Sequence, residues 1–412
     1  MDTRQLPFHP YPAFASTLEN GLDVITMHTP SDLVRLCLVF RCGGMHFEVP
    51  GAAHLLEHLL YHGPAREHML HPLLMPLAHK GVEAHAYTDY ARTVYLVSGH
   101  AEDAAPMLDA LLAIGFRASF TPDMVEKERS VIGNEMLLKL SLNRWIEWRQ
   151  RLLYPGNPEV HQPVIGSPES LKRVTGESLM LEHAKWYRPE HAAIIAIGNI
   201  PHERILKQLA GRELDTGIPA PRQELLLPDY ADSTYTTKTE DPAPQVSWYV
   251  QRPQDEAEET LFALAVNVMC GHQLCLLDHA MRIRHAGSYG VSCDRMPYPF
   301  QDISITVECA PELFQTAETE IKNAIDAVCE CRVPEITFKA VVGSYLLGRR
   351  VEAHETSGDE WVTGFTADWM DGSLESGVDH RSIVRNATPE DVAAVAQKYL
   401  VQRHGIMRVA WE

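Results

Sequence analysis

The sequence has no run of about 18 consecutive apolar residues, which a membrane-spanning helix would need. It also lacks an excess of basic residues: 36 Lys and Arg stand against 55 Asp and Glu, a formal net charge of −19. Proteins that bind nucleic acids or anionic membranes use Lys and Arg to neutralise phosphates, so we expect neither partner. The charge is compatible with neutral or basic peptides and with divalent metal ions.

Paired cysteines and a targeting segment are also missing. No two of the eight cysteines have Cys-x-x-Cys spacing, and a chain of 412 residues is long enough to build a core without disulfides, so we expect reduced thiols. The first fifteen residues, MDTRQLPFHPYPAFA, lack a basic start followed by an apolar stretch. We therefore predict no secretory signal and expect a cytoplasmic protein.

A faint internal repeat is present between the two halves. Residues 174–197 read VTGESLMLEHAKWYRPEHAAIIAI, and residues 387–410 read ATPEDVAAVAQKYLVQRHGIMRVA. In each copy a threonine, Thr175 or Thr388, can cap an amphipathic helix that leads into a strand. The alternative is two unrelated helix–strand endings with similar caps. The repeat favours an α+β fold of two similar α/β domains of about 200 residues, each a mainly antiparallel sheet packed with helices.

The stretch after Gly211 contains Pro, Asp and Thr, which is typical of a linker followed by a strand. We therefore predict a first domain at 1–212, a linker at 213–234 and a second domain at 235–412. The pattern in the first domain predicts a hairpin at 16–27 around Asn20-Gly21, strands at 32–41 and 85–97, and helices at about 104–119 and 122–153.

The run GAAHLLEHLLY at 51–61 places polar groups in an apolar helix pattern. At about 100° per residue, His54, Glu57 and His58 share one arc of the helix and the leucines occupy the opposite side. Two imidazoles at i and i+4, a third ligand from elsewhere and a neighbouring carboxylate are what hydrolytic zinc chemistry requires. The alternative is a partly exposed amphipathic helix with two ordinary histidines.

A third ligand is available from the helix that Thr121 is placed to cap. Glu128 and Glu135 lie two turns apart, nearly on one face, and either could reach the histidines. Other charged residues lie nearby, including Glu126, so the alternative is an ordinary charged helix face. Periodicity alone does not single out Glu135.

HLLEH at 54–58, followed by ERSVIGNEM at 128–136, resembles the M16 metallopeptidases, the family of pitrilysin, insulinase and the mitochondrial processing peptidases. The segment TLENGL at 17–22 also resembles the opening hairpin of that family, and the resemblance extends over nearly the whole chain. It implies one Zn²⁺ per chain held by His54, His58 and Glu135, with Glu57 as the catalytic base and Glu128 as an assisting group outside the ligand set.

Two further segments resemble the family less closely. MRIRHAGSY at 281–289 is similar to the family segment LREKRGLAY, which implies that Arg282 and Tyr289 hold substrate; the alternative is a solvated Arg and a core Tyr. His85-Ala86-Tyr87-Thr88 stands where the family usually has Asn-Ala-x-Thr, an edge strand that pairs with the substrate backbone. His85 and Ala86 are thus expected to bind peptide, and the effect of histidine in place of asparagine stays open.

The resemblance implies a zinc endopeptidase that hydrolyses short or unfolded peptides, with each chain forming half of a clamshell. We expect a homodimer, and a heterodimer with a related chain is the alternative. A non-catalytic scaffold subunit of the same family is a further alternative. His62, His68, His71 and His79 have no carboxylate partner at helical spacing, so a second metal site is not predicted.

Overall fold

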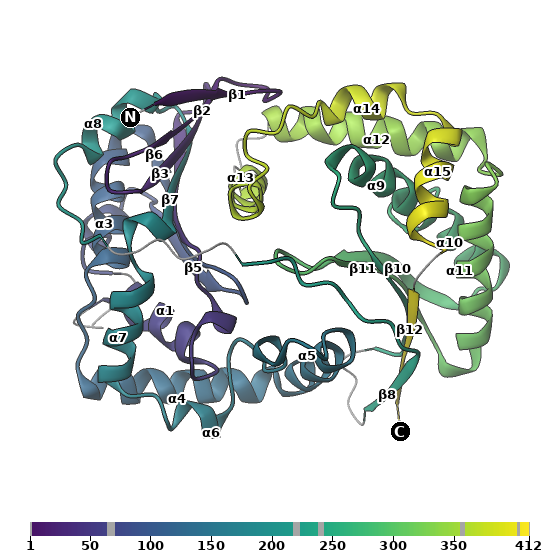
Figure 1. The fold of residues 1–412 in the computed structure, drawn as a ribbon, viewed down its shortest axis with the longest axis horizontal. Helices are drawn as coiled ribbons and strands as arrows, with labels where there is room; N and C mark the ends of the chain where they lie inside the picture. The colour runs from purple at the N-terminus through teal and green to yellow at the C-terminus, as the bar shows by residue number, and fades with distance from the viewer. Residues whose placement is uncertain are drawn as a thin grey trace. The chain divides into compact units, whose positions relative to one another are not determined.

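The computed structural model describes residues 2–63, 71–216, 223–237, 243–354, 359–401 and 404–411. Their contacts divide the chain into two compact units, each with its own sheet (Figure 1). Unit 1 comprises Met1–Leu140, Gln162–Glu224 and Glu352–Gly377, and unit 2 comprises Ser141–His161, Leu225–Val351 and Val378–Glu412. Two sheets packed with helices confirm the predicted fold class. The domain limits at 212 and 235 stay a prediction.

The sheet of unit 1 has seven strands in the order β1-β2-β3-β7-β4-β6-β5. Their bounds are Thr3–Leu6 (β1), Ala13–Thr17 (β2), Asp23–His28 (β3), Leu33–Phe40 (β4), Glu83–Thr88 (β5), Thr93–His100 (β6) and Ala192–Gly198 (β7). β3 and β7 are parallel, and every other neighbouring pair is antiparallel. The hairpin predicted at Asn20-Gly21 connects β2 to β3, and Gly21 has the positive φ of 87° that such a turn favours.

The sheet of unit 2 has five strands in the order β10-β11-β9-β12-β8. Their bounds are Ser233–Thr237 (β8), Gln245–Gln251 (β9), Ser288–Arg295 (β10), Asp302–Cys309 (β11) and His404–Trp411 (β12). This order repeats β5-β6-β4-β7-β3 of unit 1, and the single parallel pair, β12 with β8, is in the equivalent place. Thr175 and Thr388 each cap a helix through their hydroxyl groups, as the sequence repeat predicts. The two units therefore share one five-stranded topology.

Helices cover both sheets. In unit 1 they are Ala52–His62 (α1), Met75–Ala78 (α2), Ala104–Phe116 (α3), Pro122–Leu138 (α4), Pro168–Leu171 (α6), Gly176–Trp186 (α7), His202–Leu209 (α8) and Asp359–Asp371 (α13). In unit 2 they are Leu140–Leu153 (α5, from Ser141), Glu256–Cys270 (α9), Leu276–Asp278 (α10), Phe314–Cys329 (α11), Glu335–His354 (α12), His380–Asn386 (α14) and Pro389–Tyr399 (α15).

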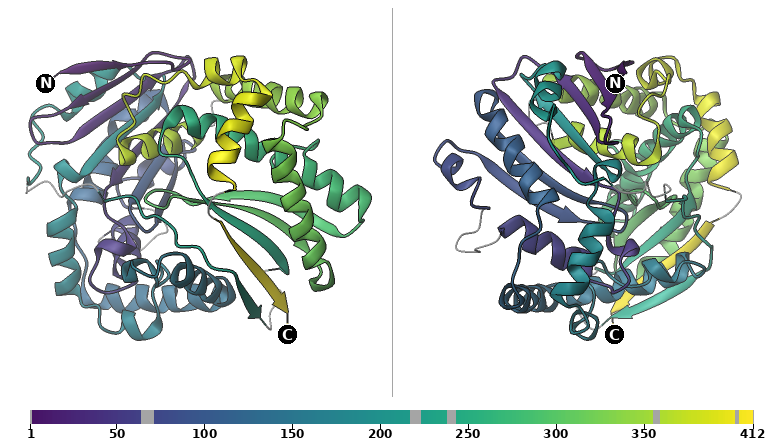
Figure 2. Two further views of the ribbon diagram at one scale, coloured as in Figure 1. Left: turned by 45° about the vertical axis from the view of Figure 1, so that its right-hand side comes forward. Right: turned by 60° about the vertical axis from the view of Figure 1, so that its left-hand side comes forward.

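The two units exchange helices. α13 comes from the second half of the sequence but packs on β4 and β7 of unit 1 (Figure 2), where Arg41 lies over the Trp369 ring at 3.7 Å. α5 comes from the first half but belongs to unit 2, where its buried Arg149 pairs with Asp302 of β11. Each sheet is thus covered on one face by helices of its own half and receives one helix from the other.

Two predicted elements need correction. The strand expected at 85–97 is two strands, β5 and β6, because Asp89 accepts the backbone N–H groups of Ala91 and Arg92 at 2.9 Å and closes a turn. The helix expected at 122–153 ends at Leu138, since Lys139 has φ −107° and ψ 16°, and a second helix starts at Leu140. Both breaks occur without glycine or proline, the residues that usually mark them.

Candidate metal centre

The predicted helix over the HLLEH run is confirmed as α1. It starts after Gly51, whose φ of 89° and whose approach to Ile165 leave no room for a side chain: a Cβ there would lie 2.8 Å from a carbonyl oxygen. It ends at Gly63, which also has a positive φ. The leucines on its apolar face are all buried: Leu55, Leu56, Leu59 and Leu60. This face fixes the helix to the core, so the opposite face can present His54, Glu57 and His58.

Helix α4 packs against α1 and brings both candidate glutamates to the histidines. Glu135 Oε2 lies 3.8 Å from His54 Nε2 and 3.9 Å from His58 Nε2. Glu128 is completely buried, and its Oε2 lies 3.3 Å from His58 Nδ1. Glu57 Oε2 lies 3.9 Å from His54 Nε2. The structure therefore gathers all five residues of the candidate site, and the two glutamates approach opposite nitrogens of one imidazole.

Glu57 lies in an environment that makes its carboxylate basic. It is 5% exposed, and burial raises the pKa of Glu57 to about 7 against the lowering effect of His58 and Thr88. The Thr88 hydroxyl donates to Glu57 Oε2 at 3.3 Å. A carboxyl group with a pKa near neutrality can both take and return a proton, as a general base must.

The pKa values of the two histidines are shifted in opposite directions. Burial, reinforced by the neighbouring His58, lowers the pKa of His54 to about 4, so His54 is neutral. Burial also opposes charge on His58, but its hydrogen bond to Glu128 and the surrounding carboxylates raise the pKa of His58 above its usual value. Three carboxylates around two imidazoles make the cluster attractive to a cation.

The residues fit a zinc ion. Two imidazole nitrogens and one carboxylate oxygen are a common ligand set for hydrolytic zinc, and ligands of a tetrahedral zinc ion lie about 3.4 Å apart. Glu135 Oε2 is slightly farther than this from the Nε2 atoms of His54 and His58, at 3.8 and 3.9 Å, and ligand atoms of His54, Glu57 and His58 lie within 4.8 Å of one another. Glu128 accepts the Nδ1 hydrogen of His58 and thereby directs its Nε2 lone pair toward the same point.

Sequence reasoning did not single out three side chains of this cluster. His62 is 8% exposed, and one of its ring nitrogens lies within 4.8 Å of ligand atoms of His58 and Glu128. The sequence indicates this position of His62, because it follows His58 by four residues and so lies on the same face of α1. Lys139 pairs with the other oxygen of Glu135 at 2.7 Å, and Thr88 contacts Glu57. His68 lies outside the described residues.

His85 and Ala86 lie in β5, which is at the edge of the unit 1 sheet. Ala84 of this strand accepts a hydrogen bond of 2.8 Å from the Tyr61 hydroxyl, which ties β5 to α1. His85 is exposed and its Nδ1 lies 2.8 Å from the carbonyl oxygen of Ala86. The strand thus borders the metal-ligand cluster, which consists of His54, Glu57, His58, Glu128 and Glu135. Its free edge can accept another strand.

Arg282 and Tyr289 belong to unit 2. Arg282 lies in a π-helical turn, His279–Arg284, and its side chain is 57% exposed. Tyr289 lies in β10, and its side chain is outside the described part of the structure. Between them Ala286 has φ 46°, at the position where the family segment has glycine. The predicted substrate roles of both residues stay predictions.

Two family models match the chain. "Insulinase (Peptidase family M16)" matches residues 23–138, and "Peptidase M16 inactive domain" matches residues 173–343. The first match contains all five residues of the cluster, and the second contains Arg282 and Tyr289.

Curated proteins and a solved structure also resemble this chain. A probable mitochondrial-processing peptidase subunit beta of Schizosaccharomyces pombe is 31% identical over 198 residues, 47% of this chain and 43% of that protein. An uncharacterized zinc protease of Mycobacterium leprae, ML0855, is 24% identical over 410 residues, 95% of this chain and 90% of that protein. The crystal structure of a protease from Helicobacter pylori superposes with a TM-score of 0.81 at 14% identity, over 97% of this chain and 99% of that one.

Several curated relatives are longer than the region they share with this chain. The chain spans 43% of the S. pombe protein and 23% of a probable zinc protease, PqqL, from Haemophilus influenzae. The two family models nevertheless follow one another along most of the sequence, and the fold agrees over nearly its full length. The chain belongs to the M16 family of peptidases.

Proposed function

We propose that the chain is a zinc-dependent endopeptidase that hydrolyses short or unfolded peptides. The observation that supports this most directly is the position of Glu57. It is a buried carboxylate with a pKa of about 7, and it lies beside two imidazoles that Glu135 approaches at 3.8 and 3.9 Å. A buried carboxylate with a raised pKa beside two imidazoles and a further carboxylate is typical of catalytic sites.

In this proposal His54, His58 and Glu135 hold one Zn²⁺ per chain. When bound, the ion supplies Lewis acidity toward a peptide carbonyl and lowers the pKa of a coordinated water. Glu57 accepts the proton of the attacking water at its carboxylate and returns it to the leaving amine. The Thr88 hydroxyl donates to Glu57 Oε2, the oxygen that lies 3.9 Å from His54 Nε2, and so helps to hold this carboxylate beside the candidate ligands. Glu128 fixes the ring of His58, and Lys139 occupies the second oxygen of Glu135.

The peptide would lie along β5 as an added strand and be held through the main chain beside His85 and Ala86. Arg282 and Tyr289 would hold the substrate from unit 2 of the same chain or of a partner. We propose a homodimer, with one chain completing the chamber of the other. A heterodimer is the second candidate, because the S. pombe relative is a processing-peptidase subunit by name. The cytoplasmic compartment stays a prediction.

The test combines metal content with cleavage of a quenched-fluorescent peptide library. Wild type should bind one zinc per chain and cleave peptides, and a chelator should abolish cleavage. Glu57→Gln should keep the zinc and lose about 10²–10⁴-fold in turnover, the usual contribution of a general base. Wild-type cleavage by the pure variant would remove Glu57 as the base, whereas zinc bound without any cleavage by wild type would favour the scaffold alternative.

A further inference from the structure

Helices α1 and α4 carry a second set of possible metal ligands beside the proposed zinc ligands. Among the residues that the structure describes, two groups of three His, Cys, Asp or Glu side chains bring one ligand atom each within 4.8 Å of one another. The first group is His54, Glu57 and His58, and the second is His58, His62 and Glu128. We name the second group the His62 site, after the residue that it adds to the metal-ligand cluster.

The His62 site repeats the pattern of the proposed zinc ligands one turn further along α1. His54, His58 and His62 follow one another at intervals of four residues, so they lie on one face of the helix. Glu128 and Glu135 lie two turns apart on α4, and the earlier glutamate meets the later histidines. Each neighbouring pair of histidines on α1 therefore has one glutamate of α4 beside it.

The donor atoms of the His62 site suit a divalent ion such as zinc. Two imidazole nitrogens and one carboxylate oxygen are the same ligand types that the proposed zinc ion would use. The sequence does not predict this set, because His62 has no carboxylate partner along its own helix and Glu128 comes from α4. Glu128 is completely buried, and buried carboxylates in proteins are paired with cations or coordinate metal ions.

The two sets of ligands differ in their access to solvent. The side chains of His54 and Glu135 are 14% and 26% exposed, whereas Glu128 is completely buried and His62 is 8% exposed. A catalytic zinc ion keeps one position open for water or substrate, and a structural zinc ion is enclosed by its ligands. An ion in the His62 site would thus be shielded from a peptide and could not take part in hydrolysis.

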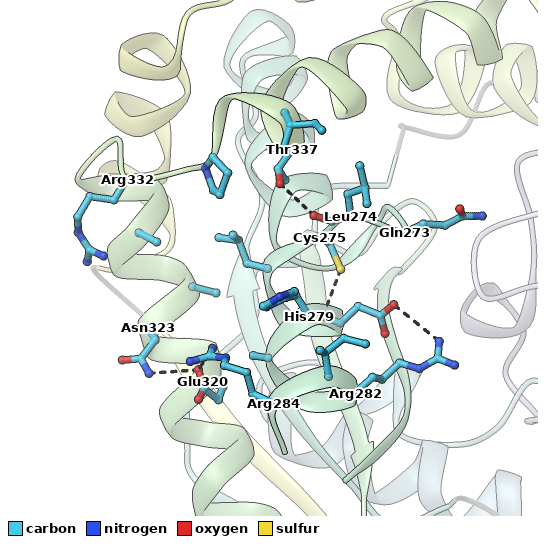
Figure 3. Close-up of a pocket in the computed structure, with 18 residues that line it drawn as sticks. Gln273, Leu274, Cys275, His279, Arg282, Arg284, Glu320, Asn323, Arg332 and Thr337 are labelled. Atoms are coloured by element: carbon cyan, nitrogen blue, oxygen red, sulfur yellow. Dashed lines mark hydrogen bonds and ion pairs between the residues drawn. The ribbon is translucent and has the colours of Figure 1, made fainter. Parts of the chain in front are cut away.

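Unit 2 contains no comparable group among its described residues. The groove beside Arg282 is lined by one histidine, His279, and by two carboxylates that arginines already use (Figure 3). Asp278 lies 3.7 Å from Arg282, and Glu320 accepts from Arg284 at 2.9 Å. Further metal binding is therefore expected on α1 and α4 rather than in this groove.

We propose that the His62 site binds a second divalent metal ion, more weakly than the proposed zinc ion, and that this second ion inhibits hydrolysis. His62 would supply a nitrogen, Glu128 a carboxylate oxygen and His58 its Nδ1, whose hydrogen passes to solvent. The affinity is lower because the two ions share His58. The rings of His58 and His62 are also 6.2 Å apart, against 4.6 Å for His54 and His58.

Inhibition follows from the double use of Glu128. Its carboxylate accepts the Nδ1 hydrogen of His58 and so orients Nε2 toward the first ion. When the second ion takes both Glu128 and Nδ1, this orientation is lost and His58 is divided between two cations. The binding of the second ion does not depend on the proposed function, whereas the inhibition rests on it.

The test of binding is the uptake of zinc by the zinc-free full chain in equilibrium dialysis at neutral pH. Wild type should take up about two ions per chain in two steps, and His62→Gln should take up only the first. His62→Leu, which places an apolar group at the buried position, should give the same result, and thermal melting checks that each zinc-free variant folds.

His79→Gln is the matched control, because His79 is exposed and belongs to neither group of ligands. It should take up zinc as wild type does. Equal uptake by His62→Gln and His79→Gln would overturn the proposal, and so would uptake of a single ion by wild type.

The test of inhibition compares peptide cleavage at one equivalent of zinc with cleavage at an excess that fills both steps. The excess should lower cleavage by wild type at least about tenfold, whereas His62→Gln should keep its own rate at both concentrations. Equal inhibition of the two proteins would overturn the inhibitory role of the His62 site. If wild type takes up both ions but cleaves no peptide at either concentration, the second metal site stands and the proposed function fails.

Discussion

Glu128 offers the sharpest test of how the metal-ligand cluster is organised. Its carboxylate is fully buried and accepts the Nδ1 hydrogen of His58, so it sets which nitrogen of that ring is available to a metal. Removing such a partner typically weakens metal binding about 10–100-fold. The N···O distance of 3.3 Å is longer than the roughly 2.7–2.9 Å of a strong charge-assisted hydrogen bond, so the lower end applies. Glu128→Gln should therefore weaken zinc about tenfold, or about 1.4 kcal/mol.

The measurement is competition between the purified chain and a chromophoric chelator for Zn²⁺ near neutral pH. Glu126→Gln is the matched control, since Glu126 lies on the same helix but its side chain is 66% exposed and pairs with Arg129. The expected order of zinc affinity is wild type and Glu126→Gln first, then Glu128→Gln, then Glu135→Gln, which removes a proposed ligand. Thermal melting of the zinc-free variants checks that each one folds. Equal affinities for Glu128→Gln and Glu126→Gln would refute the orienting role of Glu128.

Three further outcomes concern stability. Cys331 has φ 53° at the end of α11, where glycine is favoured, so Cys331→Gly should raise the free energy of unfolding by about 1 kcal/mol in urea and Cys331→Ala should not. Arg149→Met removes the charged partner of the buried Asp302 carboxylate, which keeps a hydrogen bond from the Tyr154 hydroxyl, and should cost about 3–5 kcal/mol by the same measurement; a loss below about 1 kcal/mol would contradict this. Burial lowers the pKa of His46 to about 4, below the 6.5 of the unfolded chain, so its stability contribution is complete above pH 6.5 and is lost as pH falls toward 4. About 2 kcal/mol should disappear between pH 8 and 5, and His46→Gln should remove that part of the pH dependence.

The sequence predicts the local structure around His54 well, because a period-3.6 pattern bounded by two glycines specifies both the helix and its polar face. It could not separate Glu128 from Glu135, since both lie on one face of α4 and differ only in what α4 meets across the interface with α1. One glutamate reaches Nδ1 of His58 and the other approaches Nε2. That distinction depends on tertiary packing. The resemblance to the family made this distinction, because the spacing between the histidines and the glutamate along the chain reflects how the two helices pack.

The other differences between the predicted and the observed elements have physical causes that the types of individual residues do not reveal. The turn between β5 and β6 is held by the Asp89 side chain rather than by glycine or proline. The exchange of α5 and α13 is also hidden, because an amphipathic pattern predicts a helix without specifying which sheet it covers. In α5 the sequence pattern does not indicate that Arg149 is buried. Its burial depends on the ion pair with Asp302, which is 153 residues away along the chain.

The repeated topology allows the helix that carries the candidate metal ligands to be compared with its counterpart in unit 2. α9 occupies in unit 2 the place of α1 in unit 1, between the equivalents of β4 and β5. It has no histidine, and its carboxylates are used elsewhere: Glu258 pairs with Lys398, and Glu259 pairs with Arg252. α1, by contrast, keeps the polar side chains of Glu57 and His62 buried on the face that it turns to α4. The proposed chemistry therefore rests on the first copy of the fold, in which α1 and α4 bring the candidate ligands together.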